Sequence, residues 1–383
     1  MKKNMKINIH FNEIFFYFII ISYAFDFGNI KYIITWLYII LDTIVTLKEN
    51  NWKIIYSSNI KDYFYILNSF IILIVITIFL QLRNGFNSYA INETIFLLTP
   101  ILLVMCYIKN ISSIQLKRTI NISFYIVTIS FIYKFLDVIS WENIKKISFT
   151  NSYSPFESEL AYIFIIYEAY FITQKDKKKT ILSALLCSLS FKRLCCIYAI
   201  FMLIATKIVD INKKVSKKIL YITISIFIFI PVITCWAVEN NIDEYIYNKY
   251  KISLNELTLT RYSRLELSIK SNEIRYGLGS TTTYLTKTLN RINGSNINQR
   301  NLHNDLVKIY LECGIVGIIA VIVAFFKNFS NNLISYMLVV YIFLECYFNH
   351  LFGAGSAHFW IVLYLFFATN KFIKEKGDKI KNE

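Results

Sequence analysis

The stretch NLHNDLVKIYLECGIVG, residues 301–317, ends the longest polar segment of the chain and opens an apolar helix. Histidine is scarce, with four in 383 residues, and His303 stands at this boundary. Helical spacing from His303 places four residues on one face: Val307, Tyr310, Gly314 and Gly317. The two glycines are expected to let a neighbouring helix come close. The alternative is an interfacial histidine that merely begins an ordinary transmembrane helix. The other residues of the chain distinguish these two interpretations.

The composition predicts a polytopic, all-α membrane protein. Hydrophobic residues make up 56% of the chain and aromatic residues 17%, and apolar runs long enough to cross a hydrocarbon core recur from end to end. No cleavable signal peptide is expected, because the first apolar run (about 14–24) is followed by Asp26, Gly28 and Asn29 rather than by a small-residue cleavage site.

The net charge of +16 comes with lysines that cluster in short loops between apolar runs, which is the orientation signal of a membrane protein. No folded basic domain is expected, so nucleic acid is not an expected partner. A metal site is not expected either. The seven cysteines lie within or beside apolar runs and lack C-x-x-C spacing.

Lysine clusters and apolar runs together predict about twelve transmembrane helices, with both termini in the cytoplasm. The expected helices are 14–25, 31–47, 63–82, 91–108, 120–136, 159–173, 181–191, 194–206, 219–237, 306–326, 333–348 and 358–368. The chain, 1–383, is then one integral membrane domain. Its long polar segment, 239–302, is an outer loop between the ninth and tenth helices.

The segment 180–206 does not fit a simple span. Basic clusters on both sides place both of its ends inside, yet two full spans need roughly 40 residues. We therefore expect two short helices that meet at Lys192 and Arg193. Charges at such a depth are costly in lipid, so they are expected to face a water-filled cavity or an anion. One ordinary span with a snorkelling Lys-Arg pair is the alternative.

The outer loop contains an amphipathic stretch over 258–272. Its apolar stripe consists of Tyr262, Leu265 and Ile269, with Arg261 and Arg264 a quarter-turn away. This pattern is typical of a helix lying on a membrane surface. Arginines in such a helix also fit contacts with lipid headgroups.

A glycine-punctuated turn, YGLGSTT, follows at residues 276–282. Gly277 and Gly279 can bring backbone N–H groups close to a phosphate or a sugar. A plain turn is the alternative.

Taken together, these stretches resemble the O-antigen polymerase and ligase superfamily of bacterial envelope glycosyltransferases, the Wzy-like proteins. Residues 190–194 (SFKRL) are similar to the family's S-x-R or K-R motif at the outer end of a short helix pair. Residues 261–265 and 276–279 are similar to its arginine-bearing outer helix and the G-x-G turn after it. Residues 302–317 are similar to its H-N-x-x-L…E-x-G-x-x-G signature. The resemblance covers 175–317, while the first five helices agree only in hydropathy.

The resemblance implies a GT-C-like helical bundle in the bacterial inner membrane, with its active site on the outer, periplasmic side. It implies a metal-independent transferase without a cofactor. The substrates would be an undecaprenyl-diphosphate-linked oligosaccharide donor and a second lipid-linked acceptor. A chain-length regulator protein is a further expected partner.

The resemblance also implies roles for particular residues. Arg193 and Arg264, by their motif positions, are expected to stabilise the charge that grows on the leaving diphosphate, with Lys192 and Arg261 as helpers or alternates. His303 is expected to act as the base for the acceptor hydroxyl or to orient it.

Three more residues complete the expected site. Asn304 and Asp305 are expected to fix the His303 ring or to contact sugar hydroxyls. Glu159 is a candidate second acid or base; its alternative is a residue favoured by the helix dipole in a first turn.

Three functions remain open at this point. A polymerase joins repeat units on the lipid carrier, and the Ile/Asn/Lys/Phe/Tyr-rich composition favours it. A ligase moves finished glycan to a lipid A-core acceptor. A flippase for lipid-linked oligosaccharides is expected to carry cations in both halves and a trace of repeat symmetry. Here the candidate charged residues concentrate in one half and one outer segment, which argues for a site rather than a path.

Overall fold

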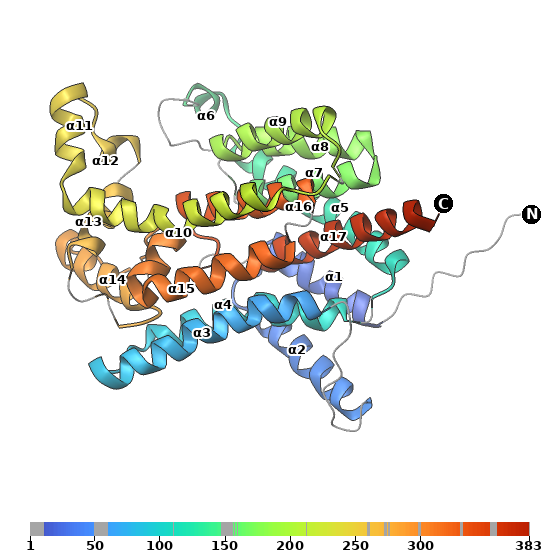
Figure 1. Ribbon diagram of the computed structural model, residues 1–383, viewed down its shortest axis with the longest axis horizontal. Helices are drawn as coiled ribbons and strands as arrows, with labels where there is room; N and C mark the ends of the chain where they lie inside the picture. Colours follow the sequence, from blue (N-terminus) through green and yellow to red (C-terminus); the bar gives the residue numbers. More distant parts are fainter. Residues whose placement is uncertain are drawn as a thin grey trace, which may run out of the picture.

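The chain folds into a bundle of α-helices (Figure 1). The computed structural model describes residues 11–49, 60–109, 111–146, 156, 158, 160–211, 213–258, 261–271, 274, 276–297, 300–329, 332–352 and 358–382. Over these residues all regular structure is helical. In lipid only a helix or a closed barrel satisfies every backbone polar group, which explains why long apolar runs become helices here.

The described residues form seventeen helices. They are α1 (Phe11–Ala24), α2 (Ile30–Glu49), α3 (Lys61–Asn84), α4 (Tyr89–Ile108), α5 (Ser113–Val138), α6 (Trp141–Lys145), α7 (Ala161–Gln174), α8 (Lys177–Leu189), α9 (Arg193–Ile208), α10 (Lys217–Glu239), α11 (Ile242–Tyr250), α12 (Leu254–Leu257), α13 (Arg261–Ile269), α14 (Ser280–Asn293), α15 (Asp305–Phe329), α16 (Leu333–Phe348) and α17 (Phe359–Asn382). Each of the twelve predicted ranges overlaps one of these helices, although α17 extends well beyond the predicted 358–368. The prediction of an all-helical bundle is therefore confirmed.

Among the described helices, six are long and apolar enough to cross a membrane. They cover Ile30–Lys48, Lys61–Asn84, Tyr89–Ile108, Ser113–Val138, Lys217–Glu239 and Asp305–Lys327. Two shorter apolar helices cover Asn12–Ala24 and Leu333–Phe348. These helices indicate a multi-pass membrane protein, and twelve crossings stay a prediction.

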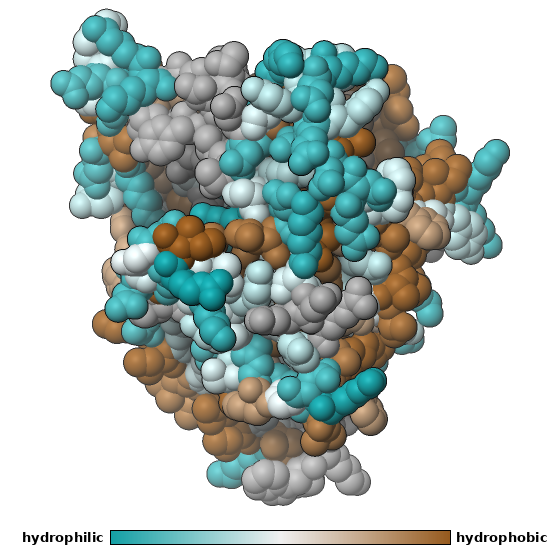
Figure 2. Space-filling model, turned by 90° about the vertical axis from the view of Figure 1, so that its left-hand side faces the viewer, coloured by the Kyte–Doolittle hydropathy of each residue, from teal (hydrophilic) through white to brown (hydrophobic). Residues whose placement is uncertain are grey.

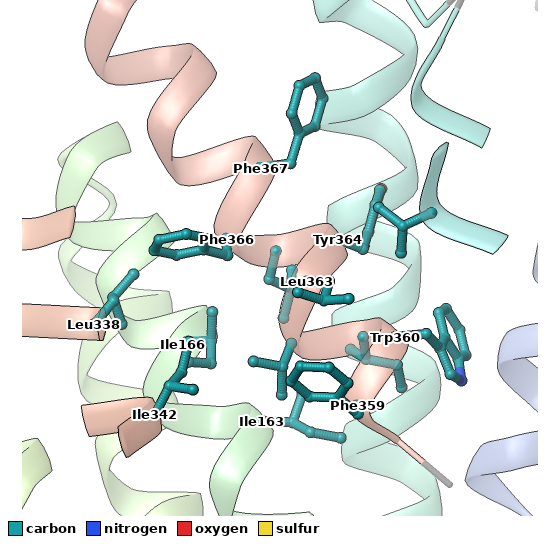
Figure 3. Close-up of a cluster of buried hydrophobic side chains, with 14 of the residues drawn as sticks. Ile163, Ile166, Leu338, Ile342, Phe359, Trp360, Leu363, Tyr364, Phe366 and Phe367 are labelled. Atoms are coloured by element: carbon teal, nitrogen blue, oxygen red, sulfur yellow. The ribbon is translucent and has the colours of Figure 1, made fainter. Parts of the chain in front are cut away.

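Helix α17 lies at the centre of the bundle, packed against α4, α5, α7 and α16. Every residue from Phe359 to Ala368 is buried. Figure 3 shows this segment meeting Ile163 and Ile166 of α7 and residues of α16. A helix that is apolar all round is stable only where neighbours cover all of its faces.

The loops predicted to be cytoplasmic and the predicted outer segment lie at opposite ends of the bundle. At the end where the C-terminus lies, three contacts join segments predicted to be cytoplasmic: Lys374 Nζ to Asp62 Oδ2 at 3.1 Å, Ser113 Oγ to Glu375 Oε1 at 2.5 Å, and Leu333 N to Lys213 O at 3.0 Å. Helices α11–α14 lie at the opposite end (Figure 1). Loops assigned to one side of the membrane therefore lie at one end of the molecule.

Helix α15 is broken near its middle by Gly314, which has φ 69° and ψ −171°. A Cβ on Gly314 would meet no atom within 4 Å. A Cβ on Gly317 would lie 2.9 Å from Leu73 Cδ2 of α3. The predicted close approach of a neighbouring helix thus occurs at Gly317. Gly314 instead allows the interruption of α15, because its backbone conformation is accessible essentially to glycine alone.

Candidate functional site

His303 lies at the end of the molecule that α11–α14 form, beside a second histidine. Its ring meets that of His350 edge to face, with 4.5 Å between ring centroids and 77° between ring planes. Three cations act electrostatically on His303: Lys192 from the loop between α8 and α9, and Arg261 and Arg264 from α13. Figure 2 looks onto this end, where hydrophilic residues cover much of the surface and hydrophobic ones border it. The structure thus gathers residues that are far apart in the sequence.

Both histidines are neutral at pH 7. Burial is the main cause that lowers the pKa of His303 to about 3, and His350, Arg261, Arg264 and Lys192 lower it further. Burial likewise lowers the pKa of His350 to about 4. A neutral imidazole can accept a proton or a hydrogen bond, as a general base must.

The local sequence explains the placement of His303. Its backbone has φ 57°, in the left-handed region that few non-glycine residues adopt. Asn304 then caps α15, its Oδ1 accepting the N–H of Val307 at 3.0 Å. Asn304 therefore acts through the backbone, by ending the left-handed turn and starting the helix.

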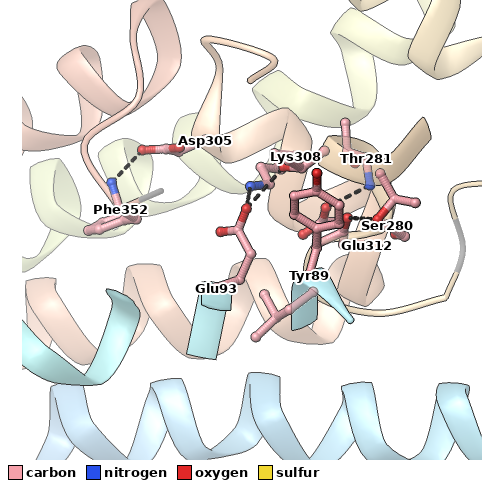
Figure 4. A network of polar contacts seen from close by, with 12 residues as sticks. Tyr89, Glu93, Ser280, Thr281, Asp305, Lys308, Glu312 and Phe352 are labelled. Carbon is pink, nitrogen blue, oxygen red and sulfur yellow. Dashed lines mark hydrogen bonds and ion pairs between the residues drawn. The ribbon is translucent and has the colours of Figure 1, made fainter. Parts of the chain in front are cut away.

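Asp305 holds the loop that carries His350. Its Oδ2 accepts the backbone N–H of Leu351 and that of Phe352, the latter at 2.6 Å (Figure 4). Its own N–H donates to Asn349 O at 3.3 Å. Asp305 is buried, and its described hydrogen bonds position the loop after α16 rather than the ring of His303.

Within the part of the chain that the structure describes, Arg261 and Arg264 donate hydrogen bonds to neutral groups. Arg261 donates to Phe348 O at 2.9 Å and to Asn349 Oδ1 at 3.2 Å. Arg264 is half-buried and donates to Asn301 O at 3.5 Å. Burial, followed by the charges of Arg300 and Arg261, lowers the pKa of Arg264. No carboxylate of the described residues pairs with Arg261, Arg264 or Arg300, so this region attracts anions.

Lys192, rather than Arg193, faces the histidines. Lys192 Nζ donates to the Tyr162 hydroxyl at 2.5 Å and lies 4.1 Å from the centroid of that ring. Its charge acts on His303, His350 and Glu345. The side chain of Arg193 is exposed at the start of α9. The predicted junction of two short helices is present, and the cation it turns inward is the lysine.

The glycine turn docks α14 onto α3 and α4. Gly277 has φ 88°, and a Cβ there would lie 2.7 Å from Thr77 Cα. Gly279 has φ 81°, and a Cβ there would lie 2.8 Å from the carbonyl carbon of Tyr89. Leu278 N donates to Thr77 Oγ1 at 3.0 Å. The contacts of these glycines with α3 and α4 fit the plain-turn alternative.

A buried polar network lies beneath the site (Figure 4). Lys308 Nζ pairs with Glu93 Oε1 at 2.6 Å, and both side chains are less than 10% exposed. Thr282 Oγ1 donates to the same Glu93 oxygen at 3.0 Å, and Thr281 N donates to Glu312 Oε1 at 2.9 Å. This network ties α4, α14 and α15 together.

Two other predictions have separate outcomes, and one residue of the site was not predicted. The amphipathic stripe is present in α13, but Tyr262 and Ile269 pack in a second core with residues of α10 and α14, so the stripe is covered by protein. Glu159 lies outside the described residues. Sequence reasoning did not assign His350 to the site, although its place in an outer turn and the scarcity of histidine were the available signals.

Comparisons with protein-family models, with curated proteins and with solved structures find no match to this chain. What the site can do therefore follows from its own residues. It offers guanidinium groups that pair with no carboxylate among the described residues, beside a neutral imidazole that can take a proton.

Proposed function

We propose that the chain is a glycosyltransferase of the bacterial inner membrane that polymerises O-antigen, capsular or exopolysaccharide repeat units. It transfers glycan from undecaprenyl diphosphate to the non-reducing end of another lipid-linked repeat unit, on the outer face of the membrane. One observation carries the proposal. Arg261, Arg264 and Lys192 lie around the neutral imidazole of His303.

The cations suit the leaving group. Cleavage of the anomeric C–O bond releases a diphosphate, whose negative charge grows in the transition state. Fixed guanidinium groups in a partly dry site stabilise that charge and match phosphate oxygens bidentately. We assign this role to Arg264, Arg261 and Lys192, and we keep exposed Arg193 as a contact for the diphosphate at the edge of the site.

The neutral imidazole suits the acceptor. The acceptor hydroxyl oxygen bonds to the anomeric carbon while the bond to the diphosphate breaks, and the electron pair of that bond leaves with the diphosphate. His303 takes the hydroxyl proton. A single in-line displacement inverts the anomeric centre.

The remaining predicted residues support this arrangement indirectly. Asn304 and Asp305 act through the backbone positions they give to His303 and to the loop after α16. Gly277 and Gly279 hold α14, and with it the outer segment, against α3 and α4. Contacts of these residues with sugar or phosphate belong to the same proposal.

Purified protein in proteoliposomes, supplied with an undecaprenyl-diphosphate-linked repeat unit, tests the proposal. A ladder of longer lipid-linked glycans is the expected product. His303→Ala and Arg264→Ala are expected to lower the rate at least 100-fold, on the scale that general base and charge-stabilising groups contribute. The matched controls are His358→Gln, which changes a partly buried histidine beside Tyr23, and Arg291→Ala, which changes an exposed arginine of the same outer segment.

A null mutant separates the proposal from its alternatives. Single-unit glycans on lipid A support a polymerase. Unattached long polymer identifies a ligase instead, and lipid-linked units trapped on the cytoplasmic face identify a flippase. Normal chain lengths in both Arg264→Ala and His303→Ala contradict the assigned site.

A further inference from the structure

His350 contacts His303 directly, yet it belongs to a different part of the chain. It follows α16, whereas His303 precedes α15, and the two ring centroids are 4.5 Å apart. The Nδ1 atom of His350 is buried and has no hydrogen-bond partner among the described residues. Its loop, rather than a hydrogen bond at this nitrogen, therefore holds the ring in place.

That loop is fixed from three sides. Asp305 Oδ2 accepts the N–H groups of the two residues that follow His350. On the other side, Asn349 donates through Nδ2 to Glu345 Oε2 at 2.8 Å and accepts from Arg261 at 3.2 Å. Burying a carboxylate is costly unless it is hydrogen-bonded, and here its hydrogen bonds go to the backbone N–H groups of this one turn. Its result is a fixed His350 ring against His303.

Charged groups face His350 from every side of the turn. Lys192 of the α8–α9 loop, Arg261 of α13 and Lys308 of α15 disfavour a proton on His350, while Glu93 of α4 favours one. Glu345 of α16 reaches the same turn through Asn349. Together with burial, this surrounding keeps His350 neutral at pH 7.

We propose that His350 is a positioning residue for His303 in glycan transfer: its ring fixes the orientation of the base and keeps water from it. This inference rests on the proposed function. His303 takes the proton of the acceptor hydroxyl as the new glycosidic bond forms, and the diphosphate departs with the electrons of the broken bond. The imidazolium then lies against the neutral ring of His350 until its proton passes to the released diphosphate or to water.

Steady-state kinetics with the same lipid-linked repeat unit test this role. His350→Ala is expected to lower kcat at least 30-fold, with KM for the donor changed less than 3-fold, because the diphosphate contacts remain. Removing His350 admits water and takes away a neighbour that lowers the pKa of His303, so the acid limb of kcat/KM is expected to move to higher pH. His350→Phe keeps a ring against His303 and is expected to recover a substantial part of kcat.

His358→Ala is the matched control, since it also removes a partly buried histidine but lies beside Tyr23, away from the site. Its kcat and acid limb are expected to equal those of the wild type once corrected for folded protein. Two results overturn the proposal: a kcat for His350→Ala within 3-fold of the wild type, or a loss of kcat with no movement of the acid limb and no recovery in His350→Phe. A wild-type protein that makes no longer glycans rejects the proposed function instead, so the two failures are distinct.

Discussion

At the scale of single residues, the two neutral histidines make stability depend on pH. An unfolded histidine has a pKa near 6.5, whereas burial lowers the pKa of His303 to about 3 and that of His350 to about 4. Below about pH 6.5 the unfolded chain therefore binds protons that the folded protein does not, and stability falls as pH falls. Each histidine is expected to cost up to about 2 kcal/mol between pH 7 and pH 5.

Thermal unfolding of the detergent-solubilised protein at pH 7 and pH 5 measures this effect. The double variant His303→Gln/His350→Gln is expected to lose less of its Tm on acidification than the wild type does. An equal drop in both proteins contradicts the lowered pKa values of the two histidines.

The junction of α8 and α9 supports a second prediction. Because Lys192 faces the histidines and Arg193 is exposed, Lys192→Ala is expected to lower the transfer rate more than Arg193→Ala, by about tenfold or more. Rates in proteoliposomes with equal amounts of each protein provide the measurement. A larger loss of rate in Arg193→Ala than in Lys192→Ala would contradict the prediction and assign the inward-facing position to Arg193.

This junction also shows what sequence can predict about a residue. Charge within an apolar run identifies the pair, because lipid penalises unpaired charge. Which side chain points inward depends on the turn: Phe191 has φ 53°, a left-handed value that no local pattern signals in a bulky aromatic residue. His350 escaped assignment for a similar reason, since Asp305 reaches its turn from 46 or 47 residues away.

At the scale of elements, the fit of α14 against α3 and α4 depends on two glycines. A Cβ at Gly277 or Gly279 would approach backbone atoms of Thr77 or Tyr89 to 2.7 or 2.8 Å, and both residues have positive φ. Substitution by alanine is expected to cost about 2 to 5 kcal/mol from the unfavourable φ and the clash combined. Gly294 is the matched control, because it has φ 58° but open space around its Cβ. Gly294→Ala is expected to cost only about 1 to 2 kcal/mol.

The Tm of each glycine variant checks this prediction, and equal losses in all three contradict the packing argument.

The positions of helices were predictable, because an apolar run in lipid satisfies its backbone polar groups by forming a helix. Their packing was not. For example, the requirement for glycine at position 277 comes from its contact with Thr77, which lies 200 positions earlier in the sequence.

At the scale of the whole molecule, loops grouped at one end predict which fusions share a compartment. A reporter fused near Asn293 is expected to be external, and one fused near Lys213 cytoplasmic, because these residues lie in loops assigned to opposite sides. Paired phosphatase and fluorescent-protein fusions measure both positions. Signals from the same compartment at both sites contradict the alternating arrangement. Lysine clusters predict this alternation of loops from the sequence alone, whereas the central place of α17 depends on contacts with four other helices that no local pattern encodes.

The break at Gly314 separates two tasks within α15. The half before it carries Asp305, Lys308 and Glu312 into the network beneath the histidines, and the half after it packs on α3 at Gly317. A rigid rod would transmit any tilt imposed by a thinner or thicker bilayer directly to the imidazole. Because α15 is interrupted at Gly314, the lipid-facing part after it can tilt to match the bilayer while the part beside His303 keeps its orientation.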